Sequence, residues 1–398
     1  MKPGHVMALL TIAACSGKHN DNFGNDNGND AGNNNNADSG VMTMPSDDSG
    51  CPFCGIDGSG GGDGGGCSPS TLNFDIPGNG CDDDDNGIVD DPPACDTGLA
   101  STGPAGDFAR AIGLCTGTKP AIADSTHWGV VSATYTQGYG SSTAPDANQH
   151  GIMTKFGSSV NPRQGAALGI LSSGYAANQD GCGTTTFKGG CAMTGSGAAP
   201  PGYPKAAGSC PIDSAANDVS ALVLQIKVPA NAKGFAYDFN FYSGEWPEWV
   251  CTSFNDSYVA WLTSAAFSGK GGDFNISFDS KGNPVSVNNN FFQVCSPANA
   301  TVGCAGSSTS TDSCSLGNGE LQGTGFFISS DSTCGQNDSG GGATGWLTTQ
   351  APAQAGETMT IQFIIWDTGD QIYDSSVLLD NWNWQPAPTS VTTTRPPS

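Results

Sequence analysis

Basic residues, histidines and long hydrophobic segments are all scarce in this chain of 398 residues. Lysine and arginine number 13 against 37 acidic residues, so the net charge is −24 and no nucleic-acid-binding surface is expected. With only four histidines and no GxSxG or HExxH motif, we expect no enzymatic activity. Beyond the first fifteen residues, no stretch is apolar enough to span a membrane.

The N-terminus has the features of an export signal. Lys2 supplies positive charge, residues 6–13 form a short apolar run, and Cys15 follows two alanines. This arrangement resembles the lipobox of bacterial lipoproteins, in which the cysteine is acylated. It predicts a signal peptide over residues 1–14, a lipid on Cys15 as the contact with the membrane, and a location at the outer membrane or cell surface. The alternative is ordinary signal cleavage.

Acidic residues are concentrated before residue 100. Residues 16–100 carry 16 of the 37 acidic side chains and one lysine, Lys18, in a segment rich in glycine and asparagine. Large apolar residues are rare over residues 15–75, so burial would not offset the loss of chain entropy. We therefore expect a disordered acidic linker over residues 15–75 that holds a domain away from the membrane, and a disordered tail over residues 387–398.

Fifteen cysteines are an odd number for an exported chain. A lipid on Cys15 leaves fourteen, which form up to seven disulfides in an oxidising compartment. Five of them precede residue 100 and nine follow it, so full pairing requires a bridge between the two parts, with Cys115 as the candidate. Cys51 and Cys54 are expected to form a structural disulfide rather than a zinc or redox site, because no second CxxC accompanies them.

Residues 76–100 contain a pattern similar to a calcium-binding loop. The candidate ligands are Asp82, Asp84, Asn86 and Asp90. Gly87 falls where such a loop turns, but Pro93 replaces the bidentate glutamate, so a complete EF-hand is absent. The segment also resembles the Cys-rich and Asp-rich motifs of myxobacterial surface proteins. We expect calcium here, in a loop bracketed by a disulfide of Cys81 with Cys95, and a solvated acidic turn is the alternative.

Residues 101–386 are expected to form one all-β domain. Apolar and polar residues alternate, as in strands that bury one face, at residues 222–228, 235–241 and 359–365. Shorter strands fit residues 258–262, 274–278, 325–329 and 377–382. One short helix fits residues 107–114, with Asp107 as its N-cap. Because strands and helices do not alternate, we predict a jelly-roll-like β-sandwich with long disulfide-stapled loops.

Two polar clusters, at residues 241–256 and 366–382, interrupt the strand pattern. Hard oxygen ligands at strand ends can meet across two sheets and hold calcium. The candidate ligands are Glu245, Asp256, Asp370, Asp374 and Asp380. The alternative is that these side chains cap turns and bond the loop backbone.

Several motifs resemble, in their order along the chain, the choice-of-anchor L domain of bacterial surface proteins. They are Asn231-Ala232-Lys233-Gly234, Glu245-Trp246-Pro247-Glu248, Phe254-Asn255-Asp256, residues 275–279, 282–288 and 344–349, and Leu378-Leu379-Asp380-Asn381. The similarity covers about residues 105–386, and Trp246 stands where the family usually has tyrosine. The resemblance implies a surface location, an anchor that differs between members, and no established enzymatic activity.

These observations favour a lipid-anchored surface protein that displays a β-sandwich for binding or adhesion to glycans or proteins, with calcium as a stabilising ion. The tryptophans considered for stacking on sugar rings are Trp246, Trp249, Trp261, Trp366, Trp382 and Trp384, although we expect at least half to fill the core. One alternative is a structural component of the cell envelope. Another is a hydrolase that uses Glu245 and Glu248 as a glycosidase pair.

Overall fold

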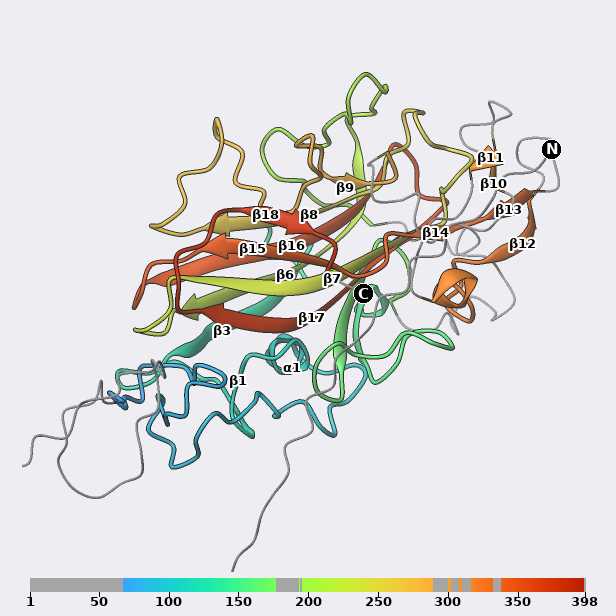
Figure 1. Ribbon diagram of the computed structural model, residues 1–398. Helices are drawn as coiled ribbons and strands as arrows, with labels where there is room; N and C mark the ends of the chain where they lie inside the picture. The colour runs from blue at the N-terminus through green and yellow to red at the C-terminus, as the bar shows by residue number, and fades with distance from the viewer. Residues whose placement is uncertain are drawn as a thin grey trace, which may run out of the picture. The chain divides into compact units, whose positions relative to one another are not determined.

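The period-two segments form the central strands of two large antiparallel sheets that pack face to face (Figure 1). One sheet contains, in spatial order, β3 (Gly129–Thr136), β6 (Ala216–Lys227), β16 (Thr358–Thr368), β8 (Ser257–Thr263) and β9 (Val285–Ser286). The other contains β18 (Thr392–Thr394), β15 (Leu347–Pro352), β7 (Gly234–Ser243), β17 (Ser375–Gln385), β5 (Leu168–Ser172) and β4 (His150–Met153), with β14 (Gly342–Ala343) paired to β7. The expected all-β fold of sandwich type is confirmed.

The computed structural model describes residues 67–176, 193, 195–288, 300–301, 308–309, 316–331 and 338–396, within a unit that spans residues 52–398. The expected signal peptide, Cys15 and the Cys51–Cys54 pair lie outside the described residues. So do six further cysteines, Cys182, Cys191, Cys295, Cys304, Cys314 and Cys334. In the described parts of the chain, no helix has the length and apolar character needed to cross a membrane.

The remaining elements are short. They are α1 (Ala105–Ala111), β1 (Cys115–Thr116), β2 (Lys119–Pro120), η1 (Ala147–Gln149), β10 (Ala300–Thr301), β11 (Ser308–Thr309), η4 (Gly317–Glu320), β12 (Ile328–Asp331) and β13 (Asp338–Gly340). Long loops connect the strands, and disulfides in the described part of the chain join Cys67 to Cys81, Cys95 to Cys115, and Cys210 to Cys251. Disulfide-stapled loops are thus present, as expected.

The main core lies between the two sheets and is built from alternate residues of the central strands. From β6, β7 and β16 it contains Leu222, Leu224, Ile226, Phe235, Tyr237, Phe239, Phe241, Met359, Ile361, Phe363 and Ile365. Tyr237 packs edge-on against Phe363 of the facing sheet, with ring centroids 5.1 Å apart. Such a pair adds about 0.5–1.5 kcal/mol beyond the burial of its area. The alternation in the sequence therefore identifies the buried face of each strand.

An N-terminal arm of residues 67–104 packs on the sandwich. Phe74 is buried in the main core, and its backbone N–H and C=O pair with the side chain of Asn231 at 3.0 and 2.8 Å. The prediction that disorder extends to residue 75 is therefore wrong for residues 67–75. Burial of Phe74 provides the apolar contact that the preceding sequence lacks, and the Cys67–Cys81 disulfide restricts the arm locally.

The expected disulfide between Cys81 and Cys95 is also wrong. Cys81 bonds to Cys67 within the arm, and Cys95 bonds to Cys115 of β1. No disulfide brackets the acidic loop. Its two ends are joined instead by the Asp90 carboxylate, which accepts the N–H groups of Asn79 and Gly80 at 3.1 Å each. A disulfide between the acidic part and the β domain was expected, with Cys115 as the candidate. The Cys95–Cys115 bond is that disulfide.

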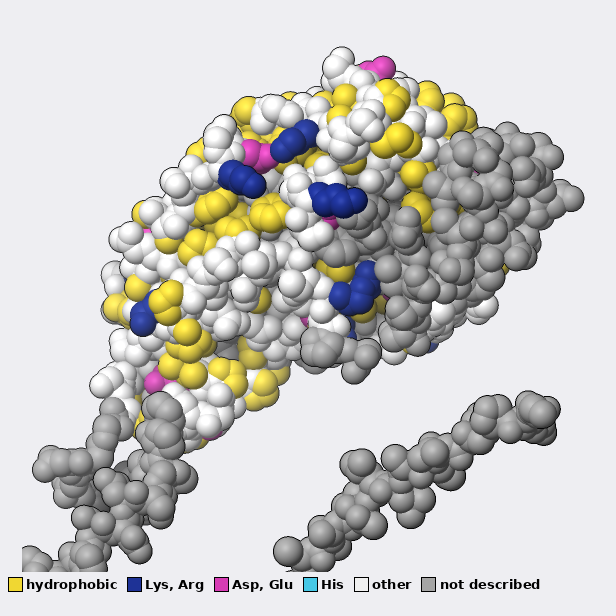
Figure 2. Space-filling view, turned by 45° about the horizontal axis from the view of Figure 1, so that its top comes forward, with side chains coloured by type: hydrophobic (Ala, Val, Ile, Leu, Met, Phe, Trp, Pro, Cys, Tyr) yellow, Lys and Arg dark blue, Asp and Glu magenta, His cyan; other side chains and the backbone are white. Residues whose placement is uncertain are grey.

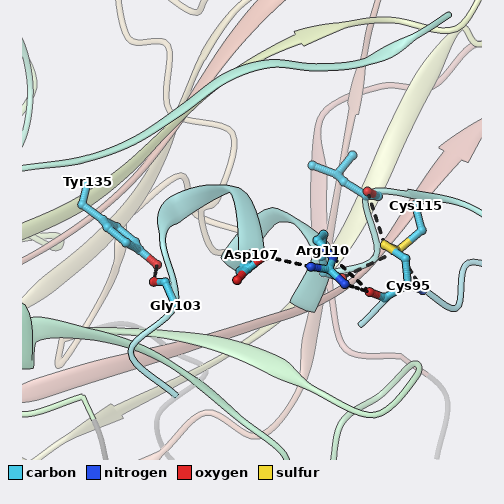
Figure 3. Close-up of polar contacts among 7 residues, drawn as sticks. Cys95, Gly103, Asp107, Arg110, Cys115 and Tyr135 are labelled. Atoms are coloured by element: carbon cyan, nitrogen blue, oxygen red, sulfur yellow. Dashed lines mark hydrogen bonds and ion pairs between the residues drawn. A yellow bond between two sulfur atoms is a disulfide. The ribbon is translucent and has the colours of Figure 1, made fainter. Parts of the chain in front are cut away.

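Helix α1 fixes the end of the arm to the sandwich (Figure 3). It begins at Ala105 after Pro104, two residues earlier than expected, so Asp107 lies in its first turn rather than at its N-cap. From there Asp107 accepts a bond of 2.9 Å from Arg110, and the Arg110 guanidinium donates to the Cys95 carbonyl at 3.0 and 2.7 Å. The cysteine that closes the disulfide is thus held by the helix as well.

Residues 392–394, within the segment predicted to be a disordered tail, form a strand of the sandwich. β18 pairs with β15 at the edge of its sheet, with Thr393 opposite Thr349 and their hydroxyls 2.8 Å apart. Arg395 follows and donates to the Thr344 carbonyl at 2.8 Å. The prediction of a disordered tail over residues 387–398 is therefore wrong for β18. The β-branched threonines of β18 favour a strand, and this strand pairs with the backbone groups at the edge of β15.

Candidate metal centre

Four carboxylates converge at one end of the sandwich. Glu245 lies just beyond the end of β7, and Asp256 immediately precedes β8. Asp367 is the second-last residue of β16, opposite Asn217 of β6. Asp370 lies in the loop that leads to β17. Since β7 and β17 belong to one sheet and β8 and β16 to the other, the cluster draws on both sheets. We call Glu245, Asp256, Asp367 and Asp370 the rim cluster.

The members of the rim cluster are close together and mostly buried. Oxygens of Glu245, Asp367 and Asp370 lie within 4.8 Å of one another. Asp256 adjoins them, since its N–H donates to Glu245 at 3.4 Å. Glu245 is 2 % exposed, Asp256 and Asp367 are fully buried, and Asp370 is half-buried. The cluster therefore reaches from the interior to the surface at Asp370.

The hydrogen bonds of the rim cluster are unevenly distributed. Asp256 accepts bonds from the Thr368 N–H at 3.0 Å and the Ser375 hydroxyl at 2.6 Å. Neither oxygen of Asp367 receives a bond from an N–H or O–H donor among the described residues, and its polar neighbour is the Asp256 carboxyl. Two adjacent carboxyl groups are stable only with a proton or a cation between them.

The electrostatics of the rim cluster follow from this burial. Burial raises the pKa of Asp256 to about 7. Burial, and after it the neighbouring carboxylates, raise the pKa of Glu245 and Asp367 well above the usual range, and burial also raises the pKa of Asp370. No lysine or arginine of the described residues forms an ion pair with the four. The described part of the chain thus places no ion-pairing positive charge beside them.

Residues 122–384 match the sequence profile of the choice-of-anchor L domain. The chain belongs to this family. The matched segment begins beside β3, ends in β17 and contains the whole rim cluster, whereas the acidic arm precedes it. Comparison with curated proteins and with solved structures found no significant match. Membership indicates a surface-anchored protein.

Within the choice-of-anchor L domain, two expected ligands lie apart from the convergent oxygens. Asp380 lies in the middle of β17, where it accepts the N–H groups of Arg163 at 2.5 Å and Gln164 at 3.3 Å, so its predicted place in a shared metal site is wrong. Asp374 is buried against Gly174, where a Cβ would come within 2.1 Å of its carboxylate. Asp380 fits the alternative, in which polar side chains cap turns and bond the loop backbone.

Asp367 is the member of the rim cluster that the sequence analysis missed. A signal was present, because Asp367 continues the odd-numbered positions of β16, of which Phe363 and Ile365 face the core. An aspartate at a core-facing position near a strand end requires a partner. A β-bulge between Ile365 and Asp367 interrupts the pairing with β6 at this point, and bulges re-aim side chains next to functional sites.

The acidic loop of the arm brings together a different set from the one expected. Oxygens of Asp75, Asp82 and Asp84 lie within 4.8 Å of one another, so two expected ligands meet one unexpected residue. Burial raises the pKa of Asp75 and of Asp84 to about 6 each. Asp75 already accepts the N–H groups of Asp83 at 2.7 Å and of residue 91 at 3.0 Å.

The other two expected ligands of that loop serve its backbone. The Asn86 side chain donates to Asp84 at 3.1 Å and accepts the Ile88 N–H at 2.8 Å. Asp90 bonds the backbone of residues 79 and 80 rather than turning toward Asp82. These contacts are those of side chains that bond the backbone of a turn.

The tryptophans are mostly internal. Those with 7 % or less of their surface exposed are Trp128, Trp246, Trp261, Trp366, Trp382 and Trp384. The expectation that at least half fill the core is confirmed. Trp249, in the loop after β7, is partly exposed and lies against Phe254 and Tyr373, with ring centroids 5.4 and 6.3 Å away. On the face drawn in Figure 2, lysine and arginine side chains lie at several separate places, and acidic surface lies between two of them.

Proposed function

We propose that this chain is a lipid-anchored surface protein that holds its choice-of-anchor L domain away from the outer membrane and uses the loops at one end of the sandwich to bind surface glycans. The observation that carries the proposal is the group of Trp249, Phe254 and Tyr373, which we call the loop aromatics. Ile372, 50 % exposed, lies beside them in sequence. Partly exposed aromatic rings with apolar neighbours suit the flat faces of sugars.

Several features support the anchoring part of the proposal. The segment around Cys15 has the lipobox pattern, and an acidic linker without large apolar residues follows it. Lipid chains partition into a membrane with about 0.8 kcal/mol for each buried CH₂ group. A domain on such a linker would meet partners at a distance from its own membrane.

Replacing Trp249 by alanine is expected to weaken glycan binding at least tenfold, because buried aromatic anchors dominate binding energies. The measurement is the retention of the purified chain on a glycan array, together with its adhesion to cells. Tyr139→Ala is the matched control, since Tyr139 is 37 % exposed and packs against Trp261, away from the loop aromatics. Equal binding by the two variants would show that the loop aromatics are not the contact surface, and binding to protein arrays alone would replace glycans by a protein partner.

Replacing Cys15 by serine is expected to move the protein from the membrane fraction to the soluble fraction, because the thiol is the acylation site in the proposal. Detergent-phase partitioning and fatty-acid labelling measure the change. Cys51→Ser is the control and should stay lipid-labelled. Labelling that persists in Cys15→Ser would contradict the lipoprotein assignment.

The alternative functions have less support from the described residues. Glu245 and Glu248, the carboxylates of the hydrolase hypothesis, are only 2 % and 3 % exposed. Glu245 moreover faces other carboxylates, which suits a structural or ligating role better than contact with a sugar chain. We keep the expectation that the chain is not an enzyme, and a glycosidase substrate panel tests it. A purely structural role in the envelope predicts no binding in the arrays above.

A further inference from the structure

We propose that the rim cluster, Glu245, Asp256, Asp367 and Asp370, binds one divalent cation of the calcium class, and that this ion holds the two sheets together at the loop end of the sandwich. The β7–β8 loop (residues 244–256) and the β16–β17 loop (residues 369–374) would be joined through it. The proposal rests on the geometry of the cluster and does not require that the domain bind glycans.

The first argument is the spacing of the oxygens. Calcium binds oxygen ligands at about 2.3–2.6 Å, so two ligands of one ion can be no more than about 5 Å apart. Oxygens of Glu245, Asp367 and Asp370 lie within 4.8 Å of one another. Glu245 follows β7, whereas Asp367 and Asp370 lie at the end of β16 and just after it, so the convergence of these two separate segments is a property of the fold rather than of a local turn.

The second argument is the environment of Asp367. It is fully buried, it points at Glu245 and Asp370, and neither of its oxygens receives a hydrogen bond from a donor among the described residues. A buried carboxylate is retained in proteins when it is paired, hydrogen-bonded or bound to a metal. Asp256 has donors for both of its oxygens, so the unsatisfied group is the one in the middle of the cluster.

The third argument is the chemistry of the donors. The cluster offers carboxylate oxygens and contains no histidine or cysteine, which disfavours zinc, copper and iron. Calcium accepts irregular sets of oxygen ligands, including bidentate carboxylates, whereas magnesium requires nearly octahedral geometry. The half-buried Asp370 provides an approach from solvent.

The position of the site indicates what the ion would do. The Cys210–Cys251 disulfide ties the β7–β8 loop to the segment before β6. Among the described residues, no disulfide ties that loop to the β16–β17 loop, although Trp249 and Tyr373 pack across the two. A cation in the rim cluster would supply this missing link and hold the loop aromatics in place.

The experiment measures thermal unfolding of the full mature chain in chelator and in calcium chloride, with calorimetric titration of calcium alone. At a calcium concentration a hundred times the Kd, the melting temperature is expected to rise by about 5–10 °C. Asp367→Asn should bind calcium at least tenfold more weakly and lose most of this rise. In chelator it should melt no lower than the wild type, because the amide keeps the shape of the side chain and needs no cation to be stable beside the other carboxyl groups.

Two matched variants locate the ion. Asp380→Asn changes a buried aspartate that already accepts backbone N–H groups, and it should keep the calcium-dependent rise whatever its basal stability. Asp82→Asn changes the acidic loop of the arm and should also keep the rise. If the wild type shows neither a rise nor heat of binding, if Asp367→Asn keeps the rise, or if Asp82→Asn removes it, the proposal is overturned.

A spectroscopic measurement covers the case in which Asp367→Asn does not fold. Terbium replaces calcium at oxygen-rich sites, and at the rim cluster its emission would be excited through Trp246 and Trp366, the neighbours in sequence of Glu245 and Asp367. In the Asp82→Asn chain, tryptophan-excited emission that calcium displaces is expected. No such emission in a folded chain would overturn the proposal. None of these readouts depends on glycan binding, so the two proposals fail separately.

Discussion

Replacing Trp382 by alanine is expected to lower the free energy of unfolding by about 3–5 kcal/mol. Trp382 is 1 % exposed and lies in β17. Its ring stacks on Phe235 with centroids 4.5 Å apart and meets Trp384 edge-on at 5.4 Å. Truncation removes these contacts and leaves a cavity in the main core, because rigid neighbouring strands relax only in part.

The measurement is denaturant unfolding followed by circular dichroism. Trp249→Ala is the matched control, because it makes the same truncation at a partly exposed position in a loop. We expect its free energy of unfolding to fall by much less, and this result would also show that the variant used for glycan binding is folded. If both variants lost the same free energy of unfolding, the stacked rings around Trp382 would stabilise the fold no more than the loop contacts of Trp249 do.

The central strands could be predicted because each buries one face. Period-two patterns at residues 222–228, 235–241 and 359–365 coincide with β6, β7 and β16, except that Val228 lies one residue beyond β6. The register of those strands places the apolar residues between the sheets. One strand that was missed, β5, lacks this contrast. β5 is buried at all five positions, since Leu168 and Ile170 face a second core that contains Phe156 and Phe326 on the outer side of the sheet. A short apolar run with a glycine shows no alternation from which to recognise a strand.

One predicted strand proved to be a series of isolated bridges. In residues 274–278, Asn275 pairs with Trp261, and Phe278 pairs with Pro284. The Asn275 side chain also bonds the backbone of Ala260 at 3.2 Å and of Ser277 at 2.8 Å, in place of a continuous ladder. Competition from an asparagine side chain is a tertiary effect that the alternation of apolar residues does not reveal.

The candidate site could be predicted only in part, because some of the contacts that decide its members join residues far apart along the chain. Glu245, Asp256 and Asp370 were identified because they stand at strand ends, where two sheets bring loops together. The exclusion of Asp380 depends on Arg163, 217 residues away, whose N–H it accepts. No local pattern encodes that contact. The pairing of Cys81 with Cys95 was predicted wrongly for the same reason, because spacing alone does not decide disulfide connectivity.

The arm was misjudged from its composition. Residues 67–75 share the low hydrophobicity of the linker, and a single residue, Phe74, changes their state by entering the core. Asp75 follows it and organises the acidic loop through the N–H groups of Asp83 and Asp84 at 2.7 and 3.3 Å. A composition average over sixty residues does not detect one anchoring side chain.

Removing the Cys95–Cys115 disulfide, as the double variant Cys95→Ala/Cys115→Ala, is expected to destabilise the domain by about 3 kcal/mol. The bond joins residues 20 apart, and this estimate follows from the chain entropy that such a loop removes from the unfolded state. The arm should also become sensitive to proteases, because without the bond Arg110 alone links the Cys95 carbonyl to α1, through contacts of 3.0 and 2.7 Å (Figure 3).

Limited proteolysis and denaturant unfolding measure the two effects separately. The control is Cys210→Ala/Cys251→Ala, which opens a disulfide between residues 41 apart that joins the segment before β6 to the β7–β8 loop and does not involve the arm. This control variant should lose a similar free energy of unfolding, because a disulfide acts mainly by restricting the unfolded chain. Cleavage of the arm should stay unchanged, because local protection depends on the contacts of the arm itself. An arm that stays protected in Cys95→Ala/Cys115→Ala would mean that the burial of Phe74 and its bonds to Asn231 suffice to dock it.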